Sequence, residues 1–186
     1  IVFITKRGET LLPAAPRVQP FLLEKADWQY VAVLLEATMR EKMRMERAFI
    51  IRITKGTKTL REVRDNVEQQ LASAKLRPFD RDIYTNLQAY FDIVLPQLEQ
   101  APLAKTLELV EGAAQVMDIA GYSTEVQNLI VRSTAEEVYL HRRGVLLVIP
   151  EVHKFAPQGR NTPAKPIMER LIREGGALGN WLWMDG

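Results

Sequence analysis

Apolar side chains in the first 110 residues recur mostly at intervals of three and four positions, the spacing of amphipathic helices. A short β-branched run opens the chain, and Pro13, Pro16 and Pro20 then exclude a helix interior. The first helix is predicted to begin at Asp27, whose carboxylate suits an N-cap. The run Phe49–Ile53 fits either the end of this helix or a strand, and both readings stay open.

Capping signals predict further helices in this part. Thr59 followed by Glu62 forms a capping-box pattern that opens a second helix. Asp80 is expected to cap a third helix, which Pro96 is expected to end. A weaker helical pattern covers 103–110. Residues 1–110 are therefore expected to be mainly helical.

The pattern changes after residue 110. Runs typical of buried strands lie at 115–119, 145–149 and 181–184, and 145–149 is apolar on both faces, as a central parallel strand should be. Helices are expected from Ser123, as N-cap, to about 143, with Gly144 as the C′ residue, and from about 162 to 174. Alternating strands and helices indicate an open α/β sheet. We expect one domain over 1–186, helical over 1–110 and α/β over 111–186.

Composition excludes several classes of site. The 186 residues contain no cysteine, which excludes disulfides, a thiolate zinc site and a cysteine nucleophile. They contain two histidines, His141 and His153, which excludes a His-rich metal cluster. No apolar run approaches the roughly 18 residues of a membrane helix. The apolar start lacks the basic region and cleavage site of a signal peptide. We expect a cytoplasmic protein without membrane contact, and, because the chain opens on Ile1 inside a strand-like run, a piece of a longer one.

The net charge of +2 hides an uneven distribution of charge along the chain. Residues 40–79 carry eleven Lys/Arg against five Asp/Glu, a net of +6. Residues 80–139 carry three against ten, a net of −7. Two explanations remain open: the segments complement each other within the fold, or the basic one offers a face to nucleic acid.

The candidate chemistry follows the strand at 145–149. The chain there continues Pro150-Glu151-Val152-His153-Lys154-Phe155, so a carboxylate stands at the carboxyl end of a central strand, where open α/β sheets bind ligands. Together with the segment 116–121, the helix before the strand and Leu171-Ile172-Arg173-Glu174-Gly175, this resembles the Walker B half of the HerA/FtsK superfamily of DNA-translocating P-loop ATPases, closest to its HerA-like branch. The resemblance covers about 114–186 and implies a RecA-like sheet.

The resemblance assigns roles to individual residues. Glu151 looks like the catalytic glutamate that orients water for attack on the γ-phosphate of ATP. His153 and Lys154 match the basic pair that follows this glutamate, and Arg173 with Glu174 matches the start of an Arg-Glu-Gly-Arg segment. ATP and Mg²⁺ are the cofactors that the resemblance implies.

The sequence departs from the family pattern at several points. Pro150 stands where the family has the Mg²⁺-binding Asp, so no metal ligand is assigned there, and Gly176 replaces the second Arg. No Gly-x-x-x-x-Gly-Lys-Ser/Thr phosphate cradle occurs in the sequence. Gly56-Thr57-Lys58-Thr59 is only superficially similar, because Thr59 is better explained as a helix cap.

Several other residues can be explained either by a structural role or by a functional one. Arg142 and Arg143 could contact a neighbouring subunit's phosphate, or simply offset the dipole at a helix C-terminus. Arg160 lies in a polar loop that could touch DNA or be an ordinary surface loop. Trp181 and Trp183 are expected in core or interface packing.

By resemblance, we expect part of an ATP-dependent DNA helicase or translocase that forms a homo-oligomeric ring, acts on double-stranded DNA and has a nuclease partner. Without a phosphate cradle, this chain alone is expected to be inactive. The alternative is a non-catalytic assembly or partner-binding module that keeps the ATPase-like sheet.

Overall fold

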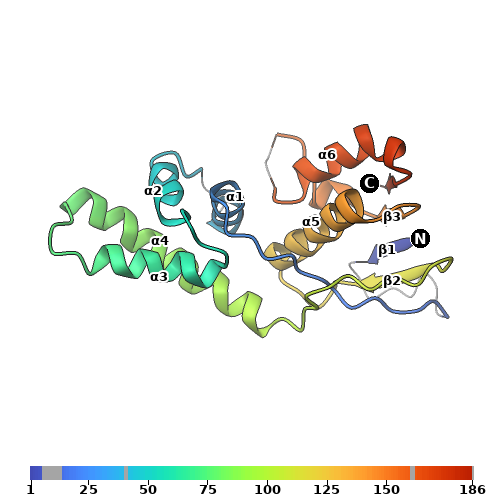
Figure 1. Ribbon diagram of the computed structural model, residues 1–186, viewed down its shortest axis with the longest axis horizontal. Helices are drawn as coiled ribbons and strands as arrows, with labels where there is room; N and C mark the ends of the chain where they lie inside the picture. The colour runs from blue at the N-terminus through green and yellow to red at the C-terminus, as the bar shows by residue number, and fades with distance from the viewer. Residues whose placement is uncertain (6–13, 40–41, 160–161, 186) are drawn as a thin grey trace. The chain divides into compact units, whose positions relative to one another are not determined.

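The computed structural model describes residues 1–5, 14–39, 42–159 and 162–185. The chain forms two compact units, one of 1–23 with 101–186 and one of 24–100 (Figure 1). The grouping differs from the division at residue 110 expected above. It differs because the first strand joins the sheet of the C-terminal part, so that the chain enters the α/β unit, leaves it for the helical unit and returns.

A four-stranded parallel sheet organises the α/β unit. Its strands are β1 (Val2–Thr5), β2 (Gln115–Asp118), β3 (Leu146–Ile149) and β4 (Trp181–Met184), in the order β2-β1-β3-β4. The expected α/β class is confirmed, and β3 lies in the interior of the sheet. Pro16 and Val18 exchange backbone hydrogen bonds with Val116 along the outer edge of β2.

Helices α5 (Thr124–His141) and α6 (Lys165–Glu174) pack against each other on one face of this sheet (Figure 1). Ser123 caps α5 as expected, since its hydroxyl accepts from the Val126 amide. The Thr134 hydroxyl lies 3.6 Å from Met117 Sδ, which places α5 over β2. Short 3₁₀ helices η1 (Val152–Lys154) and η2 (Gly175–Leu178) follow β3 and α6.

The helical unit comprises α1 (Trp28–Met39), α2 (Glu46–Ile53), α3 (Leu60–Leu71) and α4 (Pro78–Gln100). Asp27 caps the start of α1, where Oδ1 accepts from the Tyr30 amide at 2.9 Å. The run at 49–53 is helical and not a strand, but it belongs to the separate helix α2 and is not the end of the first helix. Fully buried side chains from all four helices fill the core of the unit, among them Leu35, Ile50, Val63, Leu87 and Phe91.

Several expected boundaries are wrong. Helix α4 begins at Pro78, so Asp80 lies inside its first turn and pairs with Arg77 instead of capping it. The same helix continues through Pro96 to Gln100, because buried Val94 and Leu95 hold that turn against the core.

The helix expected at 103–110 is absent from the structure, which describes this segment fully. Its backbone bonds to distant groups instead, since Ala104 donates to Pro20 O at 2.8 Å and accepts from the Leu22 amide. Helix α5 ends at His141, so Gly144, at φ 71°, lies beyond the C′ position expected for it.

Candidate functional site

Glu151 stands at the carboxyl end of β3 in a left-handed backbone conformation, with φ 54° and ψ 44°. Among the residues that the structure describes, it is the one non-glycine residue with a positive φ. Such a conformation is unfavourable for an L-residue with a long side chain, and it persists only where neighbouring contacts impose it. Strained residues of this kind concentrate at functional sites.

Neighbouring backbone contacts hold this turn in place. The Val152 amide donates to Asp185 O at 2.9 Å, which ties the residue after Glu151 to the chain beyond β4. The Lys154 amide donates to Glu151 O at 3.0 Å and closes a 3₁₀ turn. Phe155 anchors the far end of the turn with 1% of its surface exposed. The position of Glu151 is therefore set by tertiary contacts.

The Glu151 carboxylate also forms an ion pair with Lys154 Nζ. Both side chains are partly exposed, so the pair contributes little to stability. His153 is exposed in the same turn. The structure thus gathers Glu151, His153 and Lys154 at one end of β3, while Pro150 offers no side-chain ligand beside them.

Polar residues end the other strands at the same edge. Thr5 and Asp118 are paired at the ends of β1 and β2, and Asp185 follows β4. Because the strands are parallel, all of these residues meet at the carboxyl edge that carries Glu151. The sequence analysis missed Asp118 and Asp185 as members of this edge, although Asp118 lies near the end of one predicted strand and Asp185 directly follows another.

The Arg142 side chain forms hydrogen bonds within the α/β unit. Its Nη2 donates to Leu107 O at 2.7 Å and its Nε to the Glu137 carboxylate at 3.1 Å. These contacts favour the structural reading of Arg142. Arg143 donates to Arg142 O and is exposed, and Arg160 lies outside the described residues.

The segment that resembles Arg-Glu-Gly-Arg is divided between two environments. Arg173 is exposed, and its Nε donates along its own helix to Glu169 O at 3.3 Å. Glu174 instead accepts from the Tyr139 hydroxyl and pairs with Arg170 at 3.6 Å. The bond from Tyr139, followed by the charge of Arg170, holds the pKa of Glu174 below its usual value.

Arg170 completes this cluster. Its guanidinium lies 4.5 Å from the centroid of the Tyr139 ring, and Nη2 donates to the Tyr139 hydroxyl at 2.9 Å. The same bond raises the pKa of Arg170. Tyr139, Arg170 and Glu174 thereby fasten α6 to α5, a role that the sequence analysis did not predict.

Gly175 and Asn180 shape the connection from α6 to β4. A Cβ on Gly175 would lie 2.8 Å from Asn180 O, so a larger residue cannot fit there, whereas Gly176 faces open space. The fully buried Asn180 amide donates to Val138 O and Arg142 O and accepts from the Val145 amide. It joins the end of α5 to the starts of β3 and β4.

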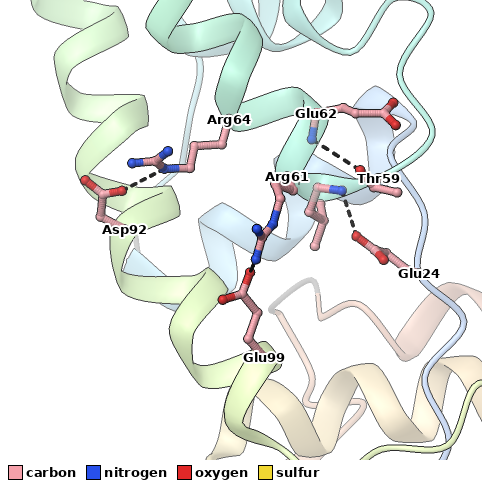
Figure 2. A network of polar contacts seen from close by, with 8 residues as sticks. Glu24, Thr59, Arg61, Glu62, Arg64, Asp92 and Glu99 are labelled. Atoms are coloured by element: carbon pink, nitrogen blue, oxygen red, sulfur yellow. Dashed lines mark hydrogen bonds and ion pairs between the residues drawn. The ribbon is translucent and has the colours of Figure 1, made fainter.

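The sequence Gly56-Thr57-Lys58-Thr59 does not form a phosphate cradle. Figure 2 shows the start of α3, where the Leu60 amide donates to Glu24 Oε1 at 2.8 Å and the Glu62 amide to Thr59 Oγ1 at 3.2 Å. The Lys58 amide donates to Glu62 Oε2 at 2.7 Å. Carboxylates of the helical unit therefore accept hydrogen bonds from backbone amides that would otherwise point toward a phosphate, as the capping interpretation predicts.

Four arginines of the basic segment 40–79 form ion pairs within the helical unit. Arg61 pairs with Glu99 and Arg64 with Asp92 (Figure 2). Arg64 also pairs with Glu68. Arg47 pairs with Glu36 and Arg77 with Asp80. These pairs favour the explanation that basic and acidic side chains complement each other within the fold, and not the explanation that the basic segment forms a continuous face for nucleic acid.

The residues at the sheet edge fit a bound Mg·ATP only in part. Glu151 suits a water-orienting acid, but Pro150 provides no ligand, and the described residues include no group of three or more acidic or histidine side chains that could hold a metal. No described helix is long and apolar enough to cross a membrane.

Comparisons with known proteins support the fold. No protein-family model matches the sequence. No curated protein matches it either. The structure is similar to that of VirB4 of Thermoanaerobacter pseudethanolicus, with a TM-score of 0.62 and 11% identity over 100% of this chain. The chain spans 61% of that VirB4 chain. The likeness fits a RecA-like arrangement of the sheet.

Proposed function

We propose that this chain is the part of a HerA-like DNA translocase that carries the water-orienting acid, in an enzyme that couples ATP hydrolysis to DNA movement. The observation that carries the proposal is the left-handed Glu151 at the carboxyl end of an interior parallel strand. The fold likeness to VirB4 and the resemblance around 145–155 support it.

In this proposal the chain supplies one half of a nucleotide site. Glu151 is the acid, with His153 and Lys154 beside it, and Arg173 is an exposed cation that a neighbouring copy in a ring could meet. Arg142 suits such a contact less, because Leu107 O and Glu137 already engage its guanidinium. When bound, Mg·ATP would supply the phosphoryl chemistry, and its cradle has to come from outside these residues.

The first test is an ATPase assay on the 186-residue chain, with Glu151→Gln as the matched variant. We expect no turnover from either protein, because neither contains a phosphate cradle. Turnover in the parent that is abolished by Glu151→Gln would contradict this expectation.

A second experiment uses the full product of the encoding gene. If the sequence before Ile1 contains Gly-x-x-x-x-Gly-Lys-Ser/Thr, we expect Mg²⁺-dependent turnover that Glu151→Gln lowers by at least about a hundredfold. Pro150→Asp then tests the metal position. A large gain in turnover would show that the proline limits metal binding, and unchanged turnover would show that another group holds the ion.

The alternative function is a non-catalytic assembly module with an ATPase-like sheet. Pro150, Gly176 and the ion pair that engages Glu151 favour it. A full-length product without the cradle motif, which binds no ATP in calorimetry, would select this alternative.

Contact with double-stranded DNA is a separate proposal, which rests on basic side chains outside the ion pairs described above, such as Lys55 and Lys58. Since phosphate contacts release counterions, DNA affinity should fall steeply with salt. Lys55→Ala with Lys58→Ala should weaken binding in a fluorescence-anisotropy titration, whereas Arg64→Ala, at a position already paired with acids, should change it little. Undetectable or salt-independent binding would remove DNA from the proposal.

Co-purification of a nuclease with the full-length protein would test the remaining partner.

A further inference from the structure

Exposed apolar side chains occur in both units of the chain. Trp181 and Trp183 on β4 are 54% and 63% exposed, so they do not lie in the core, which was one of the two positions expected for them. A single exposed apolar residue is common on proteins and needs no partner. The segment around helix α2 differs, because exposed apolar residues there form a row between two arginines.

The row consists of Met45, Ala48 and Ile51. These residues lie three positions apart, a spacing that places them in one ridge on a helix surface. All three are exposed, Met45 to 62% and Ile51 to 48%. Met45 has helical backbone angles, so the ridge continues from it into α2. Ile50 and Ile53 of the same helix are buried in the helical unit. Helix α2 therefore buries one apolar face and presents a second to the outside.

An arginine stands at each end of this ridge. Arg44 precedes Met45 and Arg52 follows Ile51, and both arginines are exposed. Neither pairs with an acid among the residues that the structure describes, whereas four other arginines of the unit do. We call Arg44, Met45, Ala48, Ile51 and Arg52 the α2 patch. It carries two positive charges and no acid.

The guanidinium of Arg52 rests on an aromatic platform. Its Cζ lies 5.5 Å from the centroid of the Phe49 ring, within the range of a cation–π contact. The Phe49 ring meets the ring of the fully buried Tyr84 edge-on, with 5.2 Å between the centroids and 84° between the planes. Tyr84 belongs to α4, so the core of the unit holds the platform. A cation that is ordered before binding loses less side-chain entropy when it pairs with a carboxylate.

Charge and apolar surface together select the class of partner. The planar fork of arginine binds carboxylates and phosphates. A nucleic-acid backbone would pair with the arginines but would offer no apolar counterpart to Met45 and Ile51. Helices that lie on a bilayer bury a broad apolar face, which three side chains around an eight-residue helix do not supply. A protein segment that carries acids beside apolar residues matches both properties of the α2 patch.

We propose that the α2 patch is a docking site for an acidic segment of a partner protein. Carboxylates of this segment pair with Arg44 and Arg52, and its apolar side chains lie on the ridge of Met45, Ala48 and Ile51. A patch of this size fits a small, transient contact. The inference uses no residue of the sheet edge and no nucleotide chemistry, so its test and that of the proposed function fail independently.

The test titrates the isotope-labelled 186-residue chain with three synthetic helical peptides of equal length, followed by NMR. The first peptide carries Glu and Leu on adjoining faces, the second has Ser in place of each Leu, and the third has Gln in place of each Glu. We expect the first peptide to shift the amide resonances of 44–53. It should bind at least about tenfold more tightly than the other two, because each of them lacks one half of the match.

Variants of the chain then locate the contact. Arg52→Ala and Ile51→Ser should each weaken binding of the first peptide at least about fivefold. Arg61→Ala and Phe79→Ser are the matched controls, since Arg61 already pairs with Glu99 and Phe79 is 56% exposed outside the patch. Both controls should bind the peptide as the parent does.

A further variant separates binding from folding. Arg44→Ala removes the other cation of the patch without touching the contact between Arg52 and Phe49. It should weaken peptide binding in the same way while the urea midpoint stays at the parent value. Unchanged binding by Arg44→Ala and Ile51→Ser, both folded, would overturn the inference whatever Arg52→Ala does.

Duplex DNA and vesicles of anionic phosphatidylglycerol serve as competing probes. Three further results would contradict the inference. They are no resonance shift at about millimolar concentration of the first peptide, equal binding of the first and second peptides, and binding of DNA or vesicles that Ile51→Ser weakens while the peptide stays unbound. The last result would assign the α2 patch to nucleic acid or to a membrane surface.

Discussion

Glu151 combines two properties at the scale of a single residue. Its carboxylate stands where a parallel sheet presents groups to a ligand, and its backbone adopts a conformation that favours glycine. The hydrogen bond between Val152 and Asp185 and the burial of Phe155 impose that conformation. A glycine would fit the turn better, so the glutamate is explained by its side chain and not by the fold.

This reasoning predicts that Glu151→Gly is more stable than Glu151→Ala by about 1 kcal/mol. Both variants lose the ion pair with Lys154, so their difference isolates the backbone. Urea unfolding of the two variants provides the measurement. An alanine variant as stable as the glycine variant would show that the turn relaxes and stores no strain.

Asn180 illustrates a buried residue whose importance is structural. Its amide satisfies two carbonyl groups and one backbone N–H at the junction of α5, β3 and β4. We expect Asn180→Ala to lower the free energy of unfolding by roughly 2–4 kcal/mol, because those buried groups lose their partners. Asn180→Asp should be at least as harmful, since a carboxylate cannot donate to the two carbonyls. Chemical denaturation of both variants tests this, and a loss below 1 kcal/mol would contradict it.

At the scale of elements, the cluster of Tyr139, Arg170 and Glu174 links α6 to α5 and gives the fold a dependence on pH. The pKa of Glu174 is lower in the folded state, chiefly because the Tyr139 hydroxyl donates to its carboxylate. The resulting stabilisation is present above the pKa of Glu174 in the unfolded chain and is lost as the pH falls through its folded value.

Tyr139→Phe should therefore lower the urea midpoint most near pH 6, and the difference from the parent should shrink toward pH 3. Tyr122→Phe is the control, because the Tyr122 hydroxyl donates to the uncharged Pro102 O. Its effect should not vary over the same range. A loss for Tyr139→Phe that stays constant from pH 6 to pH 3 would remove Glu174 as the titrating partner.

Elements with local causes were predictable from the sequence. Thr59 and Ser123 cap their helices because a hydroxyl needs only the amide three residues ahead. The strands at 115–118, 146–149 and 181–184 were recognised from their apolar runs. By contrast, Pro96 stays within a helix, and 103–110 forms none, because distant packing and Pro20 decide those conformations.

The candidate site, too, was predictable only where the local sequence determines it. Glu151 could be located because it lies just after an apolar strand, beyond Pro150. Its left-handed backbone could not, because that depends on Asp185, more than thirty residues further along the chain. The bonds from Tyr139 to Glu174 and from Asn180 to Val138 likewise join residues 35 and 42 positions apart, beyond the reach of any local pattern.

At the scale of the whole molecule, the chain leaves the α/β unit after residue 23 and returns to it at residue 101. Both ends of the intervening helical unit contact the first turn of α3. Glu24 accepts from the Leu60 amide, and Glu99 pairs with Arg61 (Figure 2). The two ends of the unit therefore lie close together, as expected for an inserted domain.

This predicts that residues 24–100, expressed alone, fold cooperatively with the helical content of α1–α4. The α/β unit should likewise fold when a short Gly/Ser linker replaces 24–100. Far-UV circular dichroism during urea unfolding tests both proteins. A gradual, non-cooperative transition in either one would show that it depends on the other.

Because the two ends of the helical unit lie close together, the length of the chain between them can vary. Closing a loop costs entropy that grows only with the logarithm of its length, about 0.6 kcal/mol for each doubling. Helices could therefore be gained or lost between Glu24 and Gln100 with almost no penalty to the register of β1 against β2. In evolutionary terms, the unit can change in size and surface while the strand ends around Glu151 stay where they are.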